Sequence, residues 1–227
     1  MSGSDTDRGR VALLALRASL YYVLGRAVLV EPDAEHVGAL REALVVCERL
    51  GAAVDDAALI AAIGRMRSQL ARLDAGAIDL DTLARDYARV FLIGHGAVAP
   101  YESVFRSPER LAMQEPRDAS LAFYARFGMG CDADAREPED HLGLQLAFMG
   151  SLTDEALRAA PEHRLAYLTG QREFLDSHLL PWVGGLAAAV DELDAAGWYG
   201  AVLGLVREFL RVDAADWVEA LIELDGA

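Results

Sequence analysis

Apolar residues return every three or four positions through most of this chain, and this periodicity constrains the fold more than any other feature of the sequence. It is clearest at residues 11–29, 55–73 and 186–210, where the apolar side chains fall on one face of a helix. No run alternates apolar and polar residues between hairpin turns, as strands would, and the 227 residues include only seven prolines. We therefore expect an all-α protein, long enough to bury a sizeable core without disulfides or a metal.

Glycine, proline and capping residues place the ends of the expected helices. They predict helices at about 8–30, 34–50, 55–73 and 79–93, one that begins at Pro108 after a Ser107 cap, and a long one that begins at Pro138. Later helices are expected at about 162–178, 181–196, 199–210 and 213–224. Because no internal repeat or low-complexity linker divides the chain, the sequence predicts a single-domain bundle of about ten helices over residues 1–227, with residues 1–8 disordered.

The formal net charge is −15, which repels phosphate backbones and disfavours nucleic acid as a partner. A cationic partner fits this charge, and acidity of this size serves solubility equally well. The start at residues 1–8 lacks the basic and apolar regions of a signal peptide, and no uncharged stretch of about 18 residues is present to span a membrane. Cys47 and Cys131 form no metal motif and fit a reducing compartment. We expect a cytoplasmic protein without direct membrane insertion.

The segment from Glu137 to His141 places carboxylates beside an imidazole at an expected helix start. Such neighbours can act as an acid/base pair, but adjacent helical residues diverge by about 100 degrees. The alternative is structural, with Asp140 capping backbone N–H groups and His141 bonding a neighbouring helix. Glu137 and His141 share a helix face at four-residue spacing, but two ligands without a third do not make a metal site.

Aromatic residues gather at two further places. Tyr87 and Phe91 lie one helical turn apart, which suits core packing and equally suits a groove for an apolar peptide. Tyr101, Glu102 and Phe105 fall in an expected loop at about 94–107, where aromatic anchors beside an acid suit either a binding hot spot or a plug for a helical core. The sequence pattern leaves both pairs of alternatives open.

A third pattern spaces Phe174, His178 and Trp182 four residues apart. For His178, an interaction with a helix end or an inter-helix hydrogen bond is favoured over ligand binding. The sequence signatures of P-loop, zinc-protease, serine-hydrolase and dinucleotide-binding sites are absent. We therefore expect no catalysis, no metal and no cofactor of the chain's own.

Four segments, taken in order, resemble the TorD/DmsD/NarJ family of chaperones that mature molybdenum redox enzymes. They are residues 87–91, 100–105, 137–149 and 174–182. The third segment is similar to the family's E-P-x-D-H-x-x-x-x-L-x-F-M signature. Tyr101 stands where the family often has tryptophan, and Ala99 replaces one proline of the usual pair. The first 75 residues match the family only as generic helices.

The resemblance implies a TorD-like, all-helical cytoplasmic chaperone. Its partners would be the apo catalytic subunit of a DMSO-reductase-family molybdoenzyme and that subunit's N-terminal, twin-arginine-type leader, held until the molybdopterin cofactor is inserted before export or assembly. Direct contact with molybdopterin, and a monomeric or homodimeric state, are left open by the resemblance. By motif position, the leader-binding residues would be Tyr87, Phe91, Tyr101, Glu102, Phe105, Asp140 and His141.

Two other classes of protein are kept as alternatives. A small helical hydrolase or transferase would use Asp140 and His141, and it would need a nucleophile that the sequence does not show. A helical ligand-sensing regulator would need a basic N-terminal helix-turn-helix, and residues 11–50 carry neither its charge nor a convincing turn glycine.

Overall fold

The computed structural model of this chain describes residues 3–93, 96–130, 136–194 and 197–226. Its α-helices are α1 (Gly3–Leu29), α2 (Ala34–Val54), α3 (Ala57–Asp74), α4 (Leu80–Tyr87), α5 (Glu102–Arg106), α6 (Glu115–Arg126), α7 (Leu142–Arg158), α8 (Pro161–Phe174), α9 (Leu180–Leu193), α10 (Trp198–Val212) and α11 (Val218–Gly226). Three π-helical segments extend them: η1 (Ala88–Leu92), η2 (Leu175–Leu179) and η3 (Asp213–Trp217). The prediction of an all-α fold is confirmed. The expected loop residues 94–95 and 131–134, Cys131 among them, lie outside the described part.

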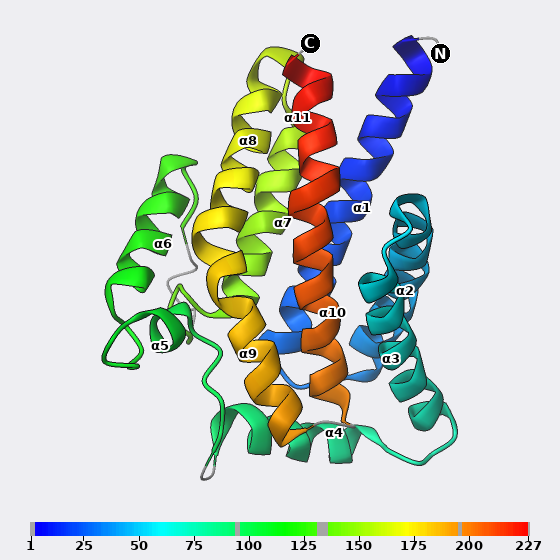
Figure 1. The fold of residues 1–227 in the computed structure, drawn as a ribbon, viewed down its shortest axis with the longest axis vertical. Helices are drawn as coiled ribbons and strands as arrows, with labels where there is room; N and C mark the ends of the chain where they lie inside the picture. The colour runs from blue at the N-terminus through cyan, green and yellow to red at the C-terminus, as the bar shows by residue number, and fades with distance from the viewer. Residues whose placement is uncertain (1–2, 94–95, 131–135, 195–196, 227) are drawn as a thin grey trace.

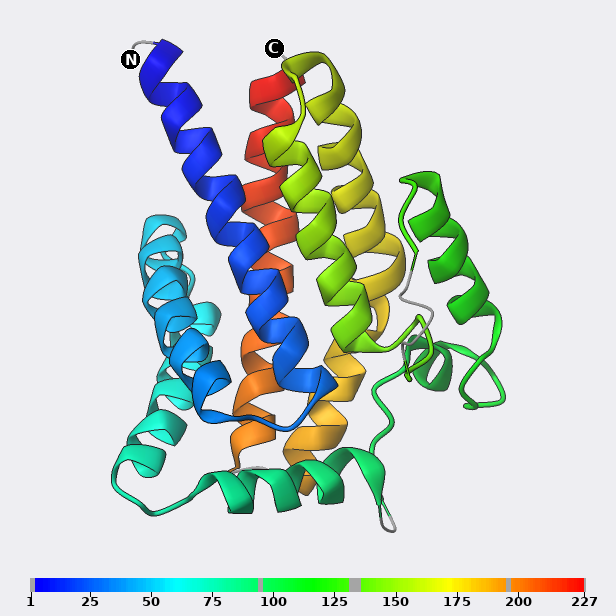
Figure 2. The same ribbon diagram turned by 180° about the vertical axis from the view of Figure 1, so that it is seen from behind.

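The long helices stand side by side along the long axis of the molecule (Figures 1 and 2). α1 packs on α7, α7 on α8, and α8 on α11. The α2–α3 hairpin lies against α1 and α10 on one side of the bundle, α5 and α6 lie on the opposite side, and α4 with η1 crosses the lower end (Figure 1). The core lies between these layers and includes Leu20, Leu24, Leu146, Leu203 and Phe209.

α1 and α7 approach each other closely at two glycines. A Cβ placed on Gly143 would lie 2.8 Å from the carbonyl oxygen of Gly25, and one placed on Gly25 would lie 2.9 Å from the carbonyl oxygen of Gly143. Any larger residue would collide with backbone at this crossing, which Figure 2 shows from the side of α1 and α7. The crossing fixes the first turn of α7 against α1.

One helix among the described residues is long and apolar enough to cross a membrane by length and composition alone. It covers Thr6–Leu29, and half of its most apolar 18-residue window is buried inside the protein. A core helix of a soluble protein meets the same criteria. The packing of this helix on α7 gives it the position of a core helix.

Two of the predicted helix starts are wrong. α1 begins at Gly3 and not at about residue 8, so the part of the 1–8 segment from Gly3 onward is helical where the sequence predicts disorder. No helix begins at Pro108, because Ser107 instead ends α5 in extended geometry, and α6 starts only at Glu115. The single-domain organisation itself stays a prediction.

The long central helix also starts later than its proline predicts. α7 begins at Leu142, four residues beyond Pro138, and His141 occupies the N-cap position. The Nδ1 atom of His141 accepts the backbone N–H of Gly143 at 3.0 Å. Glu137 therefore lies in the turn before the helix, and the helix face that the four-residue spacing predicts for Glu137 and His141 does not exist.

The helix breaks predicted before Pro181 and Asp213 are absent, because π-helical turns carry the chain through both places. Pro181 has no N–H for the carbonyl of Ser177 four residues earlier. That carbonyl instead accepts a hydrogen bond of 2.5 Å from Nη1 of Arg106 on α5. η2 therefore lets α8 and α9 continue as one bent helix and ties α5 to it.

A charged cluster is sealed in the core between α1 and η3. Arg17 and Asp213 are both fully buried, and Nε and Nη2 of Arg17 lie 2.5 and 2.8 Å from the two carboxylate oxygens of Asp213. The hydroxyl of Tyr21 donates to the same carboxylate. Burial is the largest single effect on the pKa of Arg17 and lowers it, but the charge of Asp213 and the hydrogen bonds to Asp213 and Tyr21 together outweigh burial and raise the pKa. The pair joins the start of η3 to α1.

Candidate functional site

The chain before α5 crosses the start of α7, and this joint brings together four of the predicted site residues. The backbone N–H of Glu102 donates to the carbonyl of Asp140 at 3.0 Å, and Tyr101 forms an isolated antiparallel bridge with His141. The rings of Tyr101 and His141 meet edge to face, 5.3 Å apart. The fold therefore brings these two distant segments of the chain to one place.

Asp140 and His141 do not act on each other at this joint. The Oδ2 atom of Asp140 accepts the backbone N–H of Ser103 at 2.8 Å, while His141 caps α7. Both side chains are buried, and burial raises the pKa of Asp140 and lowers the pKa of His141 to about 4. This is the structural alternative that the sequence leaves open, except that the imidazole bonds its own helix and not a neighbouring one.

Glu102 lies at the centre of a buried polar cluster behind the joint. Its Oε2 atom accepts from Nε2 of Gln145 at 2.6 Å and from Oγ of Ser120 at 3.3 Å, and it lies 3.0 Å from Nδ1 of His178. Arg106 pairs with the other carboxylate oxygen from the solvent side. The inter-helix hydrogen bond predicted for His178 is confirmed, and it joins η2 to α5.

This cluster contains a serine, a histidine and an acid, yet its geometry does not suit a catalytic triad. The acid and the serine of a triad bond opposite nitrogens of the imidazole, whereas Glu102 and Ser120 both approach Nδ1 of His178, at 3.0 and 3.3 Å. Glu102 and Ser120 are also fully buried. The cluster holds α5, α6, α7 and η2 together and offers no nucleophile to a substrate.

Tyr101 is the half-buried member of the joint. Its hydroxyl donates to Oε2 of Glu137 at 2.5 Å, and burial together with this carboxylate raises its pKa. Tyr87 lies near enough to contribute to that shift, but the Tyr87 hydroxyl donates to the carbonyl of Leu29 at 2.8 Å. Tyr101 is thus partly exposed, whereas Tyr87 is buried and bonded to the end of α1.

Tyr87 and Phe91 belong to an aromatic group below the joint. Their ring centroids are 5.2 Å apart, and both contact Tyr199 of α10, at 5.7 and 5.3 Å. Both side chains are buried, and burial raises the pKa of Tyr87 to about 12. Core packing, one of the two alternatives from the sequence, is therefore their role in this fold.

Phe105 contacts α9 and lines a separate groove. Its ring packs on Trp182 of α9, 5.5 Å between centroids, and lines a groove of about 480 Å³ between residues 97–105 and α9. The floor of the groove on α9 consists of small residues, Gly185, Ala188 and Ala189. Phe105 is thus the predicted site residue with the most direct access to an open, largely apolar surface.

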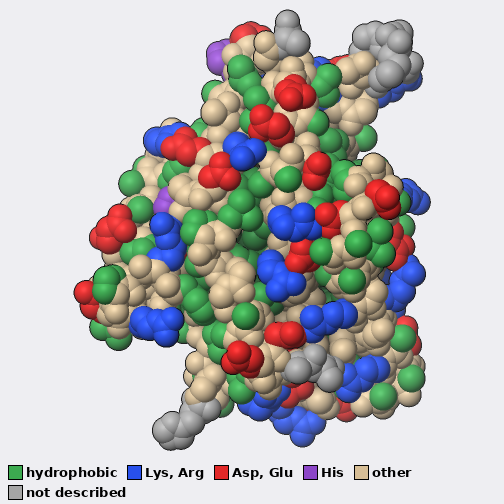
Figure 3. Space-filling view, in the orientation of Figure 1, with side chains coloured by type: hydrophobic (Ala, Val, Ile, Leu, Met, Phe, Trp, Pro, Cys, Tyr) green, Lys and Arg blue, Asp and Glu red, His purple; other side chains and the backbone are tan. Residues whose placement is uncertain are grey.

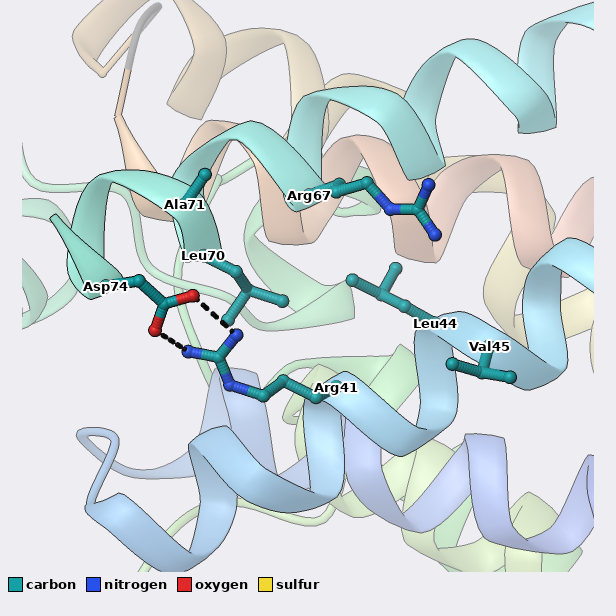
Figure 4. A pocket seen from close by; sticks show the side chains of 7 residues that line it. All are labelled: Arg41, Leu44, Val45, Arg67, Leu70, Ala71 and Asp74. Atoms are coloured by element: carbon teal, nitrogen blue, oxygen red, sulfur yellow. Dashed lines mark hydrogen bonds and ion pairs between the residues drawn. The ribbon is translucent and has the colours of Figure 1, made fainter.

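Two further hollows lie on the opposite side of the bundle, between α2 and α3. One has about 240 Å³ and the other about 360 Å³, and Arg67 lines both. In Figure 4 the guanidinium of Arg41 bridges to the carboxylate of Asp74 at one end, while Arg67 points the other way. None of the seven predicted residues lies here.

Within the described ranges, no group of three or more His, Cys, Asp and Glu side chains is arranged to hold a metal ion. Cys47 is buried, and burial raises the pKa of its thiol to about 12. The visible face of the bundle interleaves acidic, basic and apolar side chains and carries no continuous basic field (Figure 3).

Sequence reasoning missed several residues that build the site. The ion pair of Arg106 with Glu102 could have been predicted, because Arg106 stands four residues after Glu102 on one helix, the spacing of a favourable ion pair. Gln145 lies inside the matched signature without being singled out, and Ser120 had no signal. The groove floor on α9 had none either, since small residues in a helix predict no particular contact.

Comparison with known proteins gives a consistent result. Residues 52–188 match the model of a family described as nitrate reductase delta subunit. The chain is 32% identical over 154 residues to the chaperone protein TorD of Aeromonas salmonicida, covering 67% of this chain and 69% of that protein. It is 29% identical over 136 residues to TorD of Vibrio parahaemolyticus, covering 59% of this chain and 63% of that protein. The matched region thus spans about two thirds of the length of these relatives. Their name is that of a chaperone, in agreement with the expectation that the chain is not an enzyme.

Proposed function

Because the chain belongs to the nitrate reductase delta subunit family, which includes the TorD chaperones, we propose that it is a cytoplasmic maturation chaperone for a molybdoenzyme. Its client is the apo catalytic subunit of a DMSO-reductase-family enzyme. It binds the client's N-terminal leader and holds the subunit during molybdopterin cofactor insertion, before export or assembly.

The observation that carries this proposal is the joint between the 100–102 segment and the start of α7. The resemblance assigns leader binding to seven residues, and four of them meet there: Tyr101, Glu102, Asp140 and His141. Residues from two segments that resemble the family and that meet in one place support a shared task for these residues.

The seven residues differ in burial, and we assign the buried and the half-buried ones different roles. Glu102, Asp140 and His141 are buried and bonded within the protein, so we assign them to positioning the loop before α5. Tyr87 and Phe91 pack in the core against Tyr199 of α10, and we assign them no direct contact with the leader. Tyr101 and Phe105 are half-buried, and we assign direct leader contact to their outer edges, since aromatic side chains contribute most of the energy in peptide docking.

The acidity of the chain supports a basic ligand. A net charge of −15 attracts a leader that carries arginines and increases its rate of association at low salt. The buried carboxylates of Asp140 and Glu102 are not available to such arginines, so exposed acids have to supply the direct pairing.

Affinity capture tests the proposal. The tagged protein is purified from its host under anaerobic growth, and the co-purifying proteins are identified by mass spectrometry. We expect a molybdenum oxidoreductase catalytic subunit with its leader uncut, and much less of it when the client gene lacks the leader. Failure to recover any such subunit while one is expressed would refute the proposal.

Phe105→Ala tests the groove, and Phe127→Ala is its matched control. It removes a ring that lines the groove, and Phe127→Ala removes a partly buried ring in the aromatic cluster between α6 and α8. We expect the first to reduce client recovery more than the second, with thermal unfolding measured on both to account for any loss of fold.

A further inference from the structure

The groove beside Phe105 has an unusual floor. α9 turns Gly185, Ala188 and Ala189 toward it, so the helix backbone is nearly bare along about one turn. A Cβ placed on Gly185 would lie 3.4 Å from the Phe105 ring. Ala97, Val98 and Val104 complete the apolar lining. Bulky apolar side chains of a bound segment can therefore approach α9 closely.

The turn at 107–114 forms the next part of this surface, since Arg110 lines the groove. Arg110 and Met113 have φ angles of 53° and 60°, in the left-handed region that non-glycine residues seldom occupy. The same turn holds Leu111 and Met113 out in solvent, 59% and 62% exposed. A strained backbone that exposes two large apolar side chains is a pattern of binding segments.

The charges at the groove are available to a partner. Glu192 of α9 and Arg110 both line it, and both are exposed. Neither forms an ion pair or a side-chain hydrogen bond with another described residue, whereas Arg41, Arg65 and Arg67 are each paired with an acid. Glu192 is thus a free carboxylate at the edge of an apolar groove, in a protein with a net charge of −15.

We propose that this groove, together with the 107–114 turn, is the docking surface for the apolar stretch of the client's leader, and that Glu192 pairs with a basic residue beside that stretch. The inference rests on the proposed function and gives its binding surface a location. Gly185 and Glu192 lie two helical turns apart, about 10 Å along α9. A short segment with a basic end and an apolar body matches both this length and this charge.

Fluorescence anisotropy with two synthetic peptides tests the groove. One labelled peptide carries two arginines followed by ten leucine and alanine residues, and the other carries glutamines in place of the arginines. Ala188→Trp fills the groove floor, and we expect it to raise the Kd of the arginine peptide at least tenfold. Ala61→Trp, an equally exposed alanine on α3, is the matched control and should leave the Kd unchanged. Equal affinity of both variants would overturn the proposal.

The pairing is tested by Glu192→Gln. We expect a Kd about fivefold higher for the arginine peptide at low salt, no change for the glutamine peptide, and a smaller effect at high salt. Glu223→Gln on α11 changes the net charge equally at an exposed site outside the groove and should have no effect on either peptide. An equal loss in both glutamate variants would assign the effect to net charge and contradict the pairing.

Client capture separates this inference from the function on which it rests. If Ala188→Trp recovers the molybdoenzyme subunit as well as the unchanged protein does, the docking surface is elsewhere and the chaperone function stands. If neither form recovers it, the proposed function itself fails.

Discussion

The carboxylate of Asp140 and the backbone N–H of Ser103 are joined by a hydrogen bond of 2.8 Å that fixes α5 to the start of α7. The second carboxylate oxygen, Oδ1, is buried without a hydrogen-bond partner among the described atoms. Burial raises the pKa of Asp140, so ionising this carboxyl is less favourable in the folded protein than in the unfolded chain. A neutral side chain of the same shape should therefore serve this position well.

Two substitutions at Asp140 should separate the effect of losing the hydrogen-bond acceptor from the effect of losing the charge on the free energy of unfolding. We expect Asp140→Ala to lower the free energy of unfolding by about 2 kcal/mol, because the N–H of Ser103 loses its buried acceptor. Asp140→Asn keeps an acceptor and should stay within about 1 kcal/mol of the original protein at pH 7. Urea unfolding followed by circular dichroism measures both, and an Asn variant less stable than the Ala variant would contradict the positioning role.

His141 should make stability depend on pH. Burial lowers its folded pKa from 6.5 to about 4, so the folded state binds the proton less well than the unfolded chain. The stability is fully present above about pH 6.5 and decreases as the pH falls toward 4, by about 3 kcal/mol at most for this group. His141→Asn keeps an N-cap acceptor and should make the loss of stability at low pH smaller. The control His163→Asn, at an exposed histidine, should leave that loss unchanged. Unfolding at pH 7, 5.5 and 4.5 measures the difference, and parallel curves for all three proteins would refute it.

The sequence predicts the helices of this protein far better than their ends. Periodicity locates α1, α2, α3 and α4 because an amphipathic face is a local property. Pro138 misplaces the start of α7 because the chain there pairs with the segment before α5, a tertiary contact. Pro181 predicts a break that is absent because Arg106 supplies the missing hydrogen bond from 71 residues away. Local signals cannot anticipate donors that come from another helix.

The same limit applies to the candidate site. The motif residues can be identified from the sequence, but the burial of Glu102 cannot, because its partners Gln145 and His178 are 43 and 76 residues distant. A charged residue in a loop is normally exposed. Only the converging helices show that this carboxylate is structural and that the open surface lies beside Phe105.

The buried pair of Arg17 and Asp213 should be far more sensitive than exposed pairs. Asp213→Asn leaves the fully buried guanidinium uncompensated, and we expect a loss of about 3–5 kcal/mol of unfolding free energy. The double variant Arg17→Met/Asp213→Leu removes both charges and should recover most of this loss. Asp74→Asn breaks the exposed pair with Arg41 and should cost less than about 1 kcal/mol. Denaturant titration of the four proteins decides, and a double variant no more stable than Asp213→Asn would show that the charges are not the cause.

The crossing of α1 and α7 should tolerate no side chain larger than glycine. A Cβ on Gly143 would lie 2.8 Å from both the Gly25 carbonyl oxygen and the Cβ of Leu29, and backbone cannot move aside cheaply. We expect Gly143→Ala to lower the free energy of unfolding by about 1–3 kcal/mol. Gly38→Ala on α2 meets nothing within 4 Å and should instead raise it by about 0.5–1 kcal/mol, because alanine restricts the unfolded chain in favour of the helix. Opposite signs in paired urea titrations are the expected result, and since the first turn of α7 holds the joint, Gly143→Ala should also weaken leader binding while Gly38→Ala should not.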